Sequence, residues 1–261
     1  DLENMVSVGL NISKKLPIPE FYFSIELEGG GFFKWLEDAG NISLEEALSH
    51  VDNGKKILLG ENGLNILVSL HYHLSSHPSA YTNVREKEDF MLEFIENLTN
   101  IIIFKNPTFY DVWKMQDEVE ISKTFFPIIR DLDSESTYII HGEYSPANLL
   151  IKNSKMSVID FNHVCLGPWQ FDVVNFLKHP SFNLDQEQVE KLFWHYFIER
   201  INFYAKYEFG VKNRIESDEI DTKYKEKALK IFYYSNILNN LRVLGFSARY
   251  KDKLKPDIGY P

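Results

Sequence analysis

The sequence predicts an α+β protein in which a small, strand-containing start is joined to a mostly helical body. Two aromatic and β-branched runs near the N-terminus, Phe21–Leu27 and Phe32–Leu36, have the composition of strands. From residue 43 onward, apolar residues recur mainly at helical spacing. Three short strand-like runs interrupt the helices between residues 138 and 159. The 261 residues are enough to bury a sizeable core.

The two N-terminal runs are expected to form a β-hairpin. Gly29–Gly31 separate them and supply the positive φ angles that a tight turn needs. Before the hairpin, Pro17 ends any helix formed by Leu2–Ser13. After it, Ser43 and Glu46 have the spacing of a capping box, which predicts that a helix begins there.

The helical body is predicted from apolar periodicity. Leu64, Leu67, Val68 and His71 recur at i, i+3, i+4 and i+7, which marks one buried helix face. Further helices are expected at Val84–Leu98, at Val119–Ile129, around the apolar stripe of Val189, Leu192, Phe193, Tyr196 and Phe197, and at Tyr224–Tyr250.

Composition excludes several classes of protein. The 28 basic and 38 acidic residues give a net charge of −10, which disfavours binding to nucleic acid through its phosphates. The single Cys165 excludes an intrachain disulfide and a multi-cysteine zinc site. The longest apolar runs, such as Ile101–Phe104, are too short to span a membrane. We therefore expect a cytoplasmic protein that binds neither nucleic acid nor membrane, and the oligomeric state stays open.

One segment carries most of the chemical information. Tyr138–Ile140 is a predicted strand that leads into a polar loop ending at Asn148. Leu149–Ile159 is a predicted hairpin with its turn at Asn153-Ser154, so Asn148 and Asp160 stand at its two ends and their side chains can converge. An amide oxygen and a carboxylate are the hard ligands that Mg²⁺ prefers when it binds nucleotide phosphates.

A second carboxylate stands close to this pair in the sequence. Glu143 lies five residues before Asn148, on a loop stiffened by Pro146, and could reach the hydroxyl of an acceptor molecule. A carboxylate base with an Asn and an Asp metal ligand makes up the machinery of phosphoryl transfer from a magnesium nucleotide, ATP or GTP.

These residues resemble a known family. His141-Gly-Glu-x4-Asn148, followed by Ile159-Asp160-Phe161, resembles the catalytic loop and the metal-binding Asp of the aminoglycoside phosphotransferase and choline kinase superfamily. The resemblance implies a bilobal, protein-kinase-like fold with an incomplete N-lobe at residues 1–38 and a mostly helical C-lobe at residues 39–261.

The resemblance also implies roles for individual residues. Glu143 would be the catalytic base, and Asn148 and Asp160 the metal ligands. His141 would support the catalytic loop, as would Asp172, which belongs to the family-like segment Gly-Pro-x3-Asp.

Two further groups of residues follow from the resemblance. Trp35, Leu36 and Glu37 are similar to the hinge that holds adenine, and Leu70-His71 is similar to a helix-end signature of the family. On the acceptor side, the residues expected to flank the site are Tyr144, Asn162, His163 and Trp169.

The sequence departs from the family in two ways. Glu143 stands where the family usually has Asp, which we interpret as a variant active site because the carboxylate is kept. The glycine-rich turn and strand Lys of the N-lobe are not found, and we expect them upstream of Asp1. The leading hypothesis is a small-molecule kinase, acting on an aminoglycoside or on an amino-alcohol or sugar metabolite. The alternative is a catalytically impaired module that binds a nucleotide or partner.

Two other patterns have alternative interpretations. An acidic cluster before the last predicted helix either attracts a polycationic acceptor or forms a solvated loop, and the second interpretation is favoured; it comprises Glu216, Asp218, Glu219 and Asp221. His73 and His77 lie one helical turn apart and could ligate zinc, but no third ligand is evident. His71 is expected to face the core.

Overall fold

The computed structural model describes residues 18–19, 21–27, 31–36, 38–76, 87–103 and 118–250. The expected helix at Leu2–Ser13 and the hinge residue Glu37 lie outside these ranges. The α+β fold class is confirmed, with small sheets and a mostly helical body. The division into lobes at residue 38 stays a prediction.

The strands form small antiparallel sheets. The strands are β1 (Phe21–Leu27), β2 (Gly31–Leu36), β3 (Ile42–Ser43), β4 (Tyr138–Ile140), β5 (Leu149–Lys152), β6 (Lys155–Val158) and β7 (Cys165–Gly167). In the described part of the chain, β1 pairs with β2, β5 lies between β3 and β6, and β4 pairs with β7. Both expected hairpins are present, whereas β3 and β7 are too short to have been predicted from pattern alone.

Helices make up most of the described chain. They are α2 (Leu44–Ser49), α3 (Asn53–Ser76), α4 (Lys87–Ile103), α6 (Glu118–Glu135), α7 (Gln170–Leu177), α8 (Gln186–Phe209) and α9 (Thr222–Tyr250), with 3-10 turns η2 (Pro146–Asn148), η3 (Phe161–His163) and η4 (Ser217–Glu219). Ser43 caps α2 by accepting a hydrogen bond from the Glu46 amide at 3.1 Å, as the sequence predicts.

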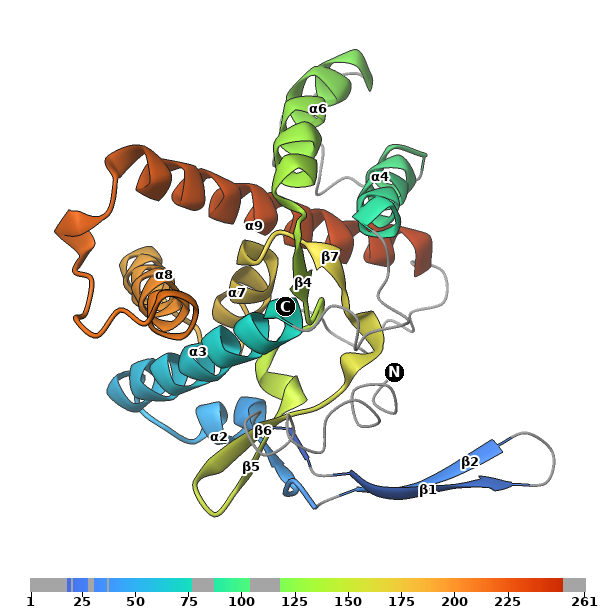
Figure 1. Cartoon of the computed structure of the whole chain (residues 1–261). Helices are drawn as coiled ribbons and strands as arrows, with labels where there is room; N and C mark the ends of the chain where they lie inside the picture. The colour runs from blue at the N-terminus through green and yellow to red at the C-terminus, as the bar shows by residue number, and fades with distance from the viewer. Residues whose placement is uncertain are drawn as a thin grey trace.

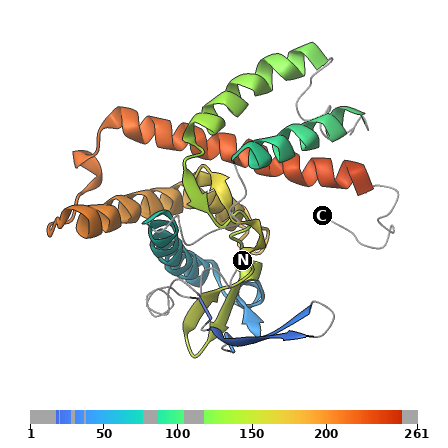
Figure 2. The ribbon, with the colours of Figure 1, turned by 45° about the vertical axis from the view of Figure 1, so that its right-hand side comes forward.

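The helices surround the loop that follows β4. Figures 1 and 2 show α3 beside α8, and the long α9 running past α7 with α4 packed against its C-terminal half. The β1–β2 hairpin projects away from the helical body in both views. Within the described ranges, no helix has the length and apolarity to cross a membrane.

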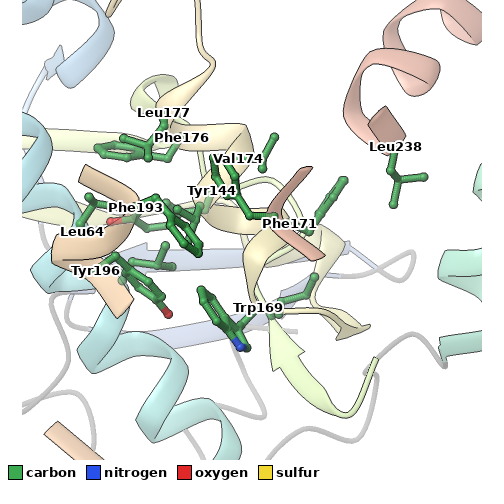
Figure 3. Close-up of a cluster of buried hydrophobic side chains, with 14 of the residues drawn as sticks. Leu64, Tyr144, Trp169, Phe171, Val174, Phe176, Leu177, Phe193, Tyr196 and Leu238 are labelled. Atoms are coloured by element: carbon green, nitrogen blue, oxygen red, sulfur yellow. The ribbon is translucent and has the colours of Figure 1, made fainter. Parts of the chain in front are cut away.

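The core lies where α3, α7 and α8 meet. Figure 3 shows Trp169 and Phe171, from the start of α7, among buried aromatic side chains of α8 such as Phe193 and Tyr196. His71 of α3 is 1% exposed and faces this core, as expected. Burying such large side chains stabilises the body that carries the loop between β4 and β5.

Candidate active site

The β5–β6 hairpin places Asn148 and Asp160 side by side. Leu149 pairs with Val158, and the Ile159 amide donates to the Asn148 carbonyl at 3.0 Å, which extends the ladder by one step beyond the strands. The two-residue turn at the far end is made by Asn153 and Ser154, both with positive φ, as hairpin turns of this length require. The convergence expected from the sequence is therefore present in the backbone.

The side chains of Asn148 and Asp160, at this end of the hairpin, each have an oxygen atom that could ligate a cation. The Asn148 amide donates through Nδ2 to the Glu143 carbonyl at 2.9 Å, which orients its Oδ1 as the atom left to ligate a cation. Asp160 has φ 61°, a left-handed conformation that is uncommon for a residue with a side chain. Its Oδ1 accepts a hydrogen bond from Asn162 Nδ2 at 2.7 Å. An amide oxygen and a carboxylate on adjacent positions fit a hard divalent cation such as Mg²⁺.

Asp172 anchors the loop between β4 and β5 through buried hydrogen bonds. This fully buried carboxylate accepts hydrogen bonds from the backbone amides of His141, at 2.7 Å, and Gly142, at 2.9 Å. His71 Nε2 contacts the same carboxylate at 2.8 Å, and His71 Nδ1 lies 2.6 Å from the Tyr196 hydroxyl. Because burial raises the pKa of Tyr196 well above 10, its hydroxyl donates to Nδ1, and Nε2–H of His71 donates to Asp172.

His141 connects the loop to the end of β6. Its Nδ1 accepts from the Glu143 amide at 3.3 Å, so the proton is on Nε2, which donates to the Ile159 carbonyl at 3.0 Å. Burial lowers the pKa of His141, which favours this neutral form. Gly142 has φ +82°, and a Cβ there would overlap the His163 carbonyl, so only glycine fits.

An arginine and a histidine contact the Glu143 carboxylate. Arg242 of α9 donates from Nη2 to Glu143 Oε1, and its Nε lies 3.3 Å from Glu93 of α4. His163 Nε2 lies 3.4 Å from Glu143 Oε2. Glu143 is therefore linked to η3 on one side and to the last helix on the other.

A pocket of about 660 Å³ opens beside Glu143. Its walls come from the loop between β4 and β5, from α7 and the segment after it, and from α9. The lining residues are Glu143, Ser145, Asn148, Asn175, Lys178, His179, Pro180, Asn239, Asn240, Arg242, Val243 and Leu244.

Two residues that the sequence placed on the acceptor side lie in the core. The expectation for Tyr144 is wrong, because its side chain is fully buried and its hydroxyl donates to the Gly63 carbonyl of α3 at 2.7 Å. The expectation for Trp169 is also wrong, because it is 3% exposed and stacks on Tyr196 with a centroid distance of 5.2 Å. Figure 3 shows both rings among the buried side chains. Trp169 also covers the guanidinium of Arg200, which lies 5.1 Å from its ring.

The other expected site residues are placed differently. Asn162 and His163 follow Asp160 on η3 and contact Asp160 and Glu143, respectively. The backbones of Trp35 and Leu36 lie in β2, opposite β1, and their role as a hinge stays a prediction.

Sequence reasoning missed several pocket residues. They are Asn175, Lys178, Asn239, Asn240 and Arg242. The resemblance pointed to the C-terminal helices only in general terms, and no motif singles out one turn of a 29-residue helix.

Among the residues that the structure describes, neither the acidic cluster nor His73 belongs to a metal site. Asp221 accepts from the amides of Lys223 and Tyr224 at the start of α9, and Glu219 accepts from the Glu216 amide at 2.6 Å. The loop interpretation of this cluster fits these contacts. Among the described residues, no group of three His, Cys, Asp or Glu side chains could hold a metal ion, and His77 lies outside them.

Comparisons with known proteins agree with this geometry. The sequence profile of the phosphotransferase enzyme family matches residues 109–207, which include the catalytic loop, the hairpin and Asp172. No curated protein is similar enough in sequence to count as a match.

The fold is similar to those of small-molecule kinases. The GDP complex of wild-type aminoglycoside 2'-phosphotransferase-IIIa matches 96% of this chain and 75% of its own, at 15% identity and a TM-score of 0.55. An aminoglycoside phosphotransferase with GDP and kanamycin matches 97% and 77%, at 14% identity and a TM-score of 0.54. Plasmodium vivax ethanolamine kinase matches 98% and 69%, at 11% identity and a TM-score of 0.50.

At these identities the structural likeness shows the fold alone, which is similar to the protein-kinase-like fold of the aminoglycoside phosphotransferases. The profile match over residues 109–207 shows that this segment, which holds the loop motif, is similar to the phosphotransferase enzyme family.

Proposed function

We propose that the protein transfers the γ-phosphate of a magnesium nucleotide, ATP or GTP, to a hydroxyl group of a small molecule. The observation that carries this proposal is that two hydrogen bonds link the segments that contain Glu143, Asn148 and Asp160. Asn148 donates to the Glu143 carbonyl, and the residue before Asp160 donates to the Asn148 carbonyl. One hydrogen-bonded unit would thus supply a base and two metal ligands, and Glu143 and Asn148 of this unit line an open pocket.

Asn148 and Asp160 would hold the magnesium ion. When bound, Mg²⁺ neutralises phosphate charge and orients the γ-phosphate. The chain's own contribution is to fix the two ligand oxygens. Nδ2 of Asn148 is engaged by the loop, and the left-handed backbone of Asp160 aims its carboxylate from the end of the hairpin.

Glu143 would orient the acceptor hydroxyl and take its proton. In a loose transition state for phosphoryl transfer, the base acts mainly by positioning the nucleophile, so a glutamate can serve if it is held in place. Its extra methylene adds a rotatable bond relative to aspartate. The contacts of Arg242 with Oε1 and of His163 with Oε2 restrict that freedom. Arg242 is thus a positioning residue in this mechanism.

The alternative is a module that binds a nucleotide or partner without turnover. The Glu143–Arg242 contact is the observation that favours it, because the base is engaged before any acceptor arrives. The two functions differ in one result: the module binds nucleotide but transfers no phosphate.

Thermal melting of the full-length gene product tests the nucleotide site, with Mg·ATP and Mg·GTP as separate additions. A nucleotide at a hundred times its dissociation constant adds about 2.7 kcal/mol, which raises the melting temperature by about 5 °C or more. Asp160→Asn should lose this rise, whereas Asp218→Asn, an exposed carboxylate before α9, should keep it. The absence of a rise with either nucleotide in the wild type would overturn the proposal.

A further inference from the structure

The charges that line the pocket differ from those of the whole chain. The chain has ten more acidic than basic residues, yet among the described residues that line the pocket there is one carboxylate, Glu143, against the two cations Lys178 and Arg242. Burial lowers the pKa of His179, so this fourth titratable side chain is neutral at pH 7.

The Glu143 carboxylate already has an arginine and a histidine as neighbours. Arg242 donates to Glu143 Oε1, and the Nε2 atom of His163 lies 3.4 Å from Oε2. A cationic acceptor would have to compete with a guanidinium for the same oxygens. Glu93 of α4 offsets the positive charge of Arg242, because its Oε1 lies 3.3 Å from the arginine Nε.

The hydrogen-bond partner of Lys178 is neutral, unlike the carboxylates that contact Arg242. Its Nζ donates to the neutral Oε1 of Gln186 at 3.1 Å. Burial lowers the pKa of Lys178, and the more distant charge of Glu190 opposes this shift only in part. A partly desolvated ammonium is stabilised when a ligand brings a negative charge to it.

Amide side chains form much of the remaining wall. Asn148 and Asn175 each donate one hydrogen bond to a carbonyl of the catalytic loop. Asn239 and Asn240, one after the other on α9, line the pocket, and no hydrogen bond joins their side chains to any described residue. Amides both donate and accept, which suits a ligand with several hydroxyl groups.

Three of the four acidic residues that could favour a polycation are engaged in local hydrogen bonds. Asp221 caps the start of α9, and Glu216 and Glu219 cap the preceding 3-10 turn. The pocket is lined by residues 239–244 of α9. About 18 residues of helix separate Asp221 from Asn239, roughly 27 Å at 1.5 Å per residue. The cluster therefore lies far from the acceptor.

We infer that the acceptor is a polyhydroxy compound with an acid group, of the sugar-acid type, rather than an amine-rich polycation. This inference rests on the proposed function and specifies its substrate class. Asn239 and Asn240 would bind hydroxyl groups, Glu143 would receive the reacting hydroxyl, and the acid group would lie toward Lys178.

Label transfer into charge-sorted metabolites tests this inference. A deproteinised cell extract is separated by ion exchange into cationic, neutral and anionic fractions. Each fraction is then incubated with the full-length gene product and γ-labelled nucleotide with magnesium. We expect most label in acceptors of the anionic fraction, less in the neutral fraction and least in the cationic fraction.

Variants at Lys178 sharpen the test. Lys178→Glu should lower transfer into the anionic fraction relative to the neutral fraction on the order of tenfold, because two units of charge change beside the ligand. The ratio within one preparation is independent of the amount of folded protein. Lys212→Glu makes the same change of charge on an exposed loop after α8 and should leave the ratio unaltered.

The outcomes separate the two claims. Label that goes mainly to the cationic fraction, or a ratio that Lys178→Glu does not change, overturns the inference and leaves the kinase proposal standing. Label in no fraction, from a protein that binds Mg·nucleotide, contradicts the kinase proposal and the inference with it.

Discussion

Replacing Asp172 with asparagine should destabilise the protein by about 3–5 kcal/mol. The carboxylate accepts three N–H groups, from His141, Gly142 and His71, at 2.7–2.9 Å, and all are buried. An asparagine has one oxygen, so its NH2 group would face one of these donors. One charge-assisted hydrogen bond, worth about 1.5–3 kcal/mol, is lost, and the other two weaken by roughly 1 kcal/mol each.

Urea unfolding at pH 7 measures this loss, with the Asp172→Asn and wild-type proteins compared at equal concentration. Asp185→Asn is the matched control, because Asp185 caps α8 from an exposed position and asparagine is an equally good N-cap. A loss below about 1 kcal/mol for Asp172→Asn would refute the reasoning, since the carboxylate contacts would then contribute no more than an ordinary polar contact.

Three further predictions follow from the same loop. Gly142→Ala should cost more than about 3 kcal/mol, because the positive φ is unfavourable for alanine and its Cβ would overlap a backbone carbonyl. Arg242→Met should lower kcat about tenfold or more, with a smaller effect for Arg242→Lys, because Glu143 loses a positioning contact. Stability should decrease as the pH falls from 7 to 5.5, because burial lowers the pKa of His71 and His141 below the ordinary value of 6.5. The unfolded chain then binds protons that the folded chain does not, so stability is complete above pH 6.5 and decreases by about 1.4 kcal/mol per unit per histidine below it.

Two of these predictions have a matched control, and the third has a contradicting outcome. Gly210→Ala also has positive φ but meets no atom within 4 Å, so it should cost only the backbone strain, and an equal loss at Gly142 would contradict the clash argument. Arg214→Met removes an exposed ion pair with Glu199 and should leave kcat unchanged. A stability of the wild type that stays constant between pH 7 and pH 5.5 would disprove the predicted pH effect.

The elements governed by short-range sequence patterns were predictable. The hairpin from Leu149 to Ile159 has its turn at the expected dipeptide, Asn153-Ser154. Two strand-forming runs separated by two turn-forming residues can pair in few other registers. The convergence of Asn148 and Asp160 followed from that register. The Ser43 cap of α2 depended on four consecutive residues, and it is present for the same reason.

The features that depend on tertiary packing were not predictable. Tyr144 and Trp169 are close to Glu143 and Asp160 in sequence, but sequence distance does not say which way a ring points, and the apolar faces of α3 and α8 bury both. Arg242 lies 99 residues after Glu143. Its contact depends on how α9 packs against α4 and α7, which no local pattern encodes.

Transfer of labelled γ-phosphate to the small molecules of an unfractionated cell extract tests the central claim most directly. The wild-type, full-length gene product is compared with Glu143→Gln and Asp160→Asn, and Mg·nucleotide binding is measured beside transfer. The kinase account predicts transfer by the wild type, loss of transfer with retained nucleotide binding in Glu143→Gln, and loss of both in Asp160→Asn. Nucleotide binding by the wild type without any transfer would contradict it and leave the binding module in its place.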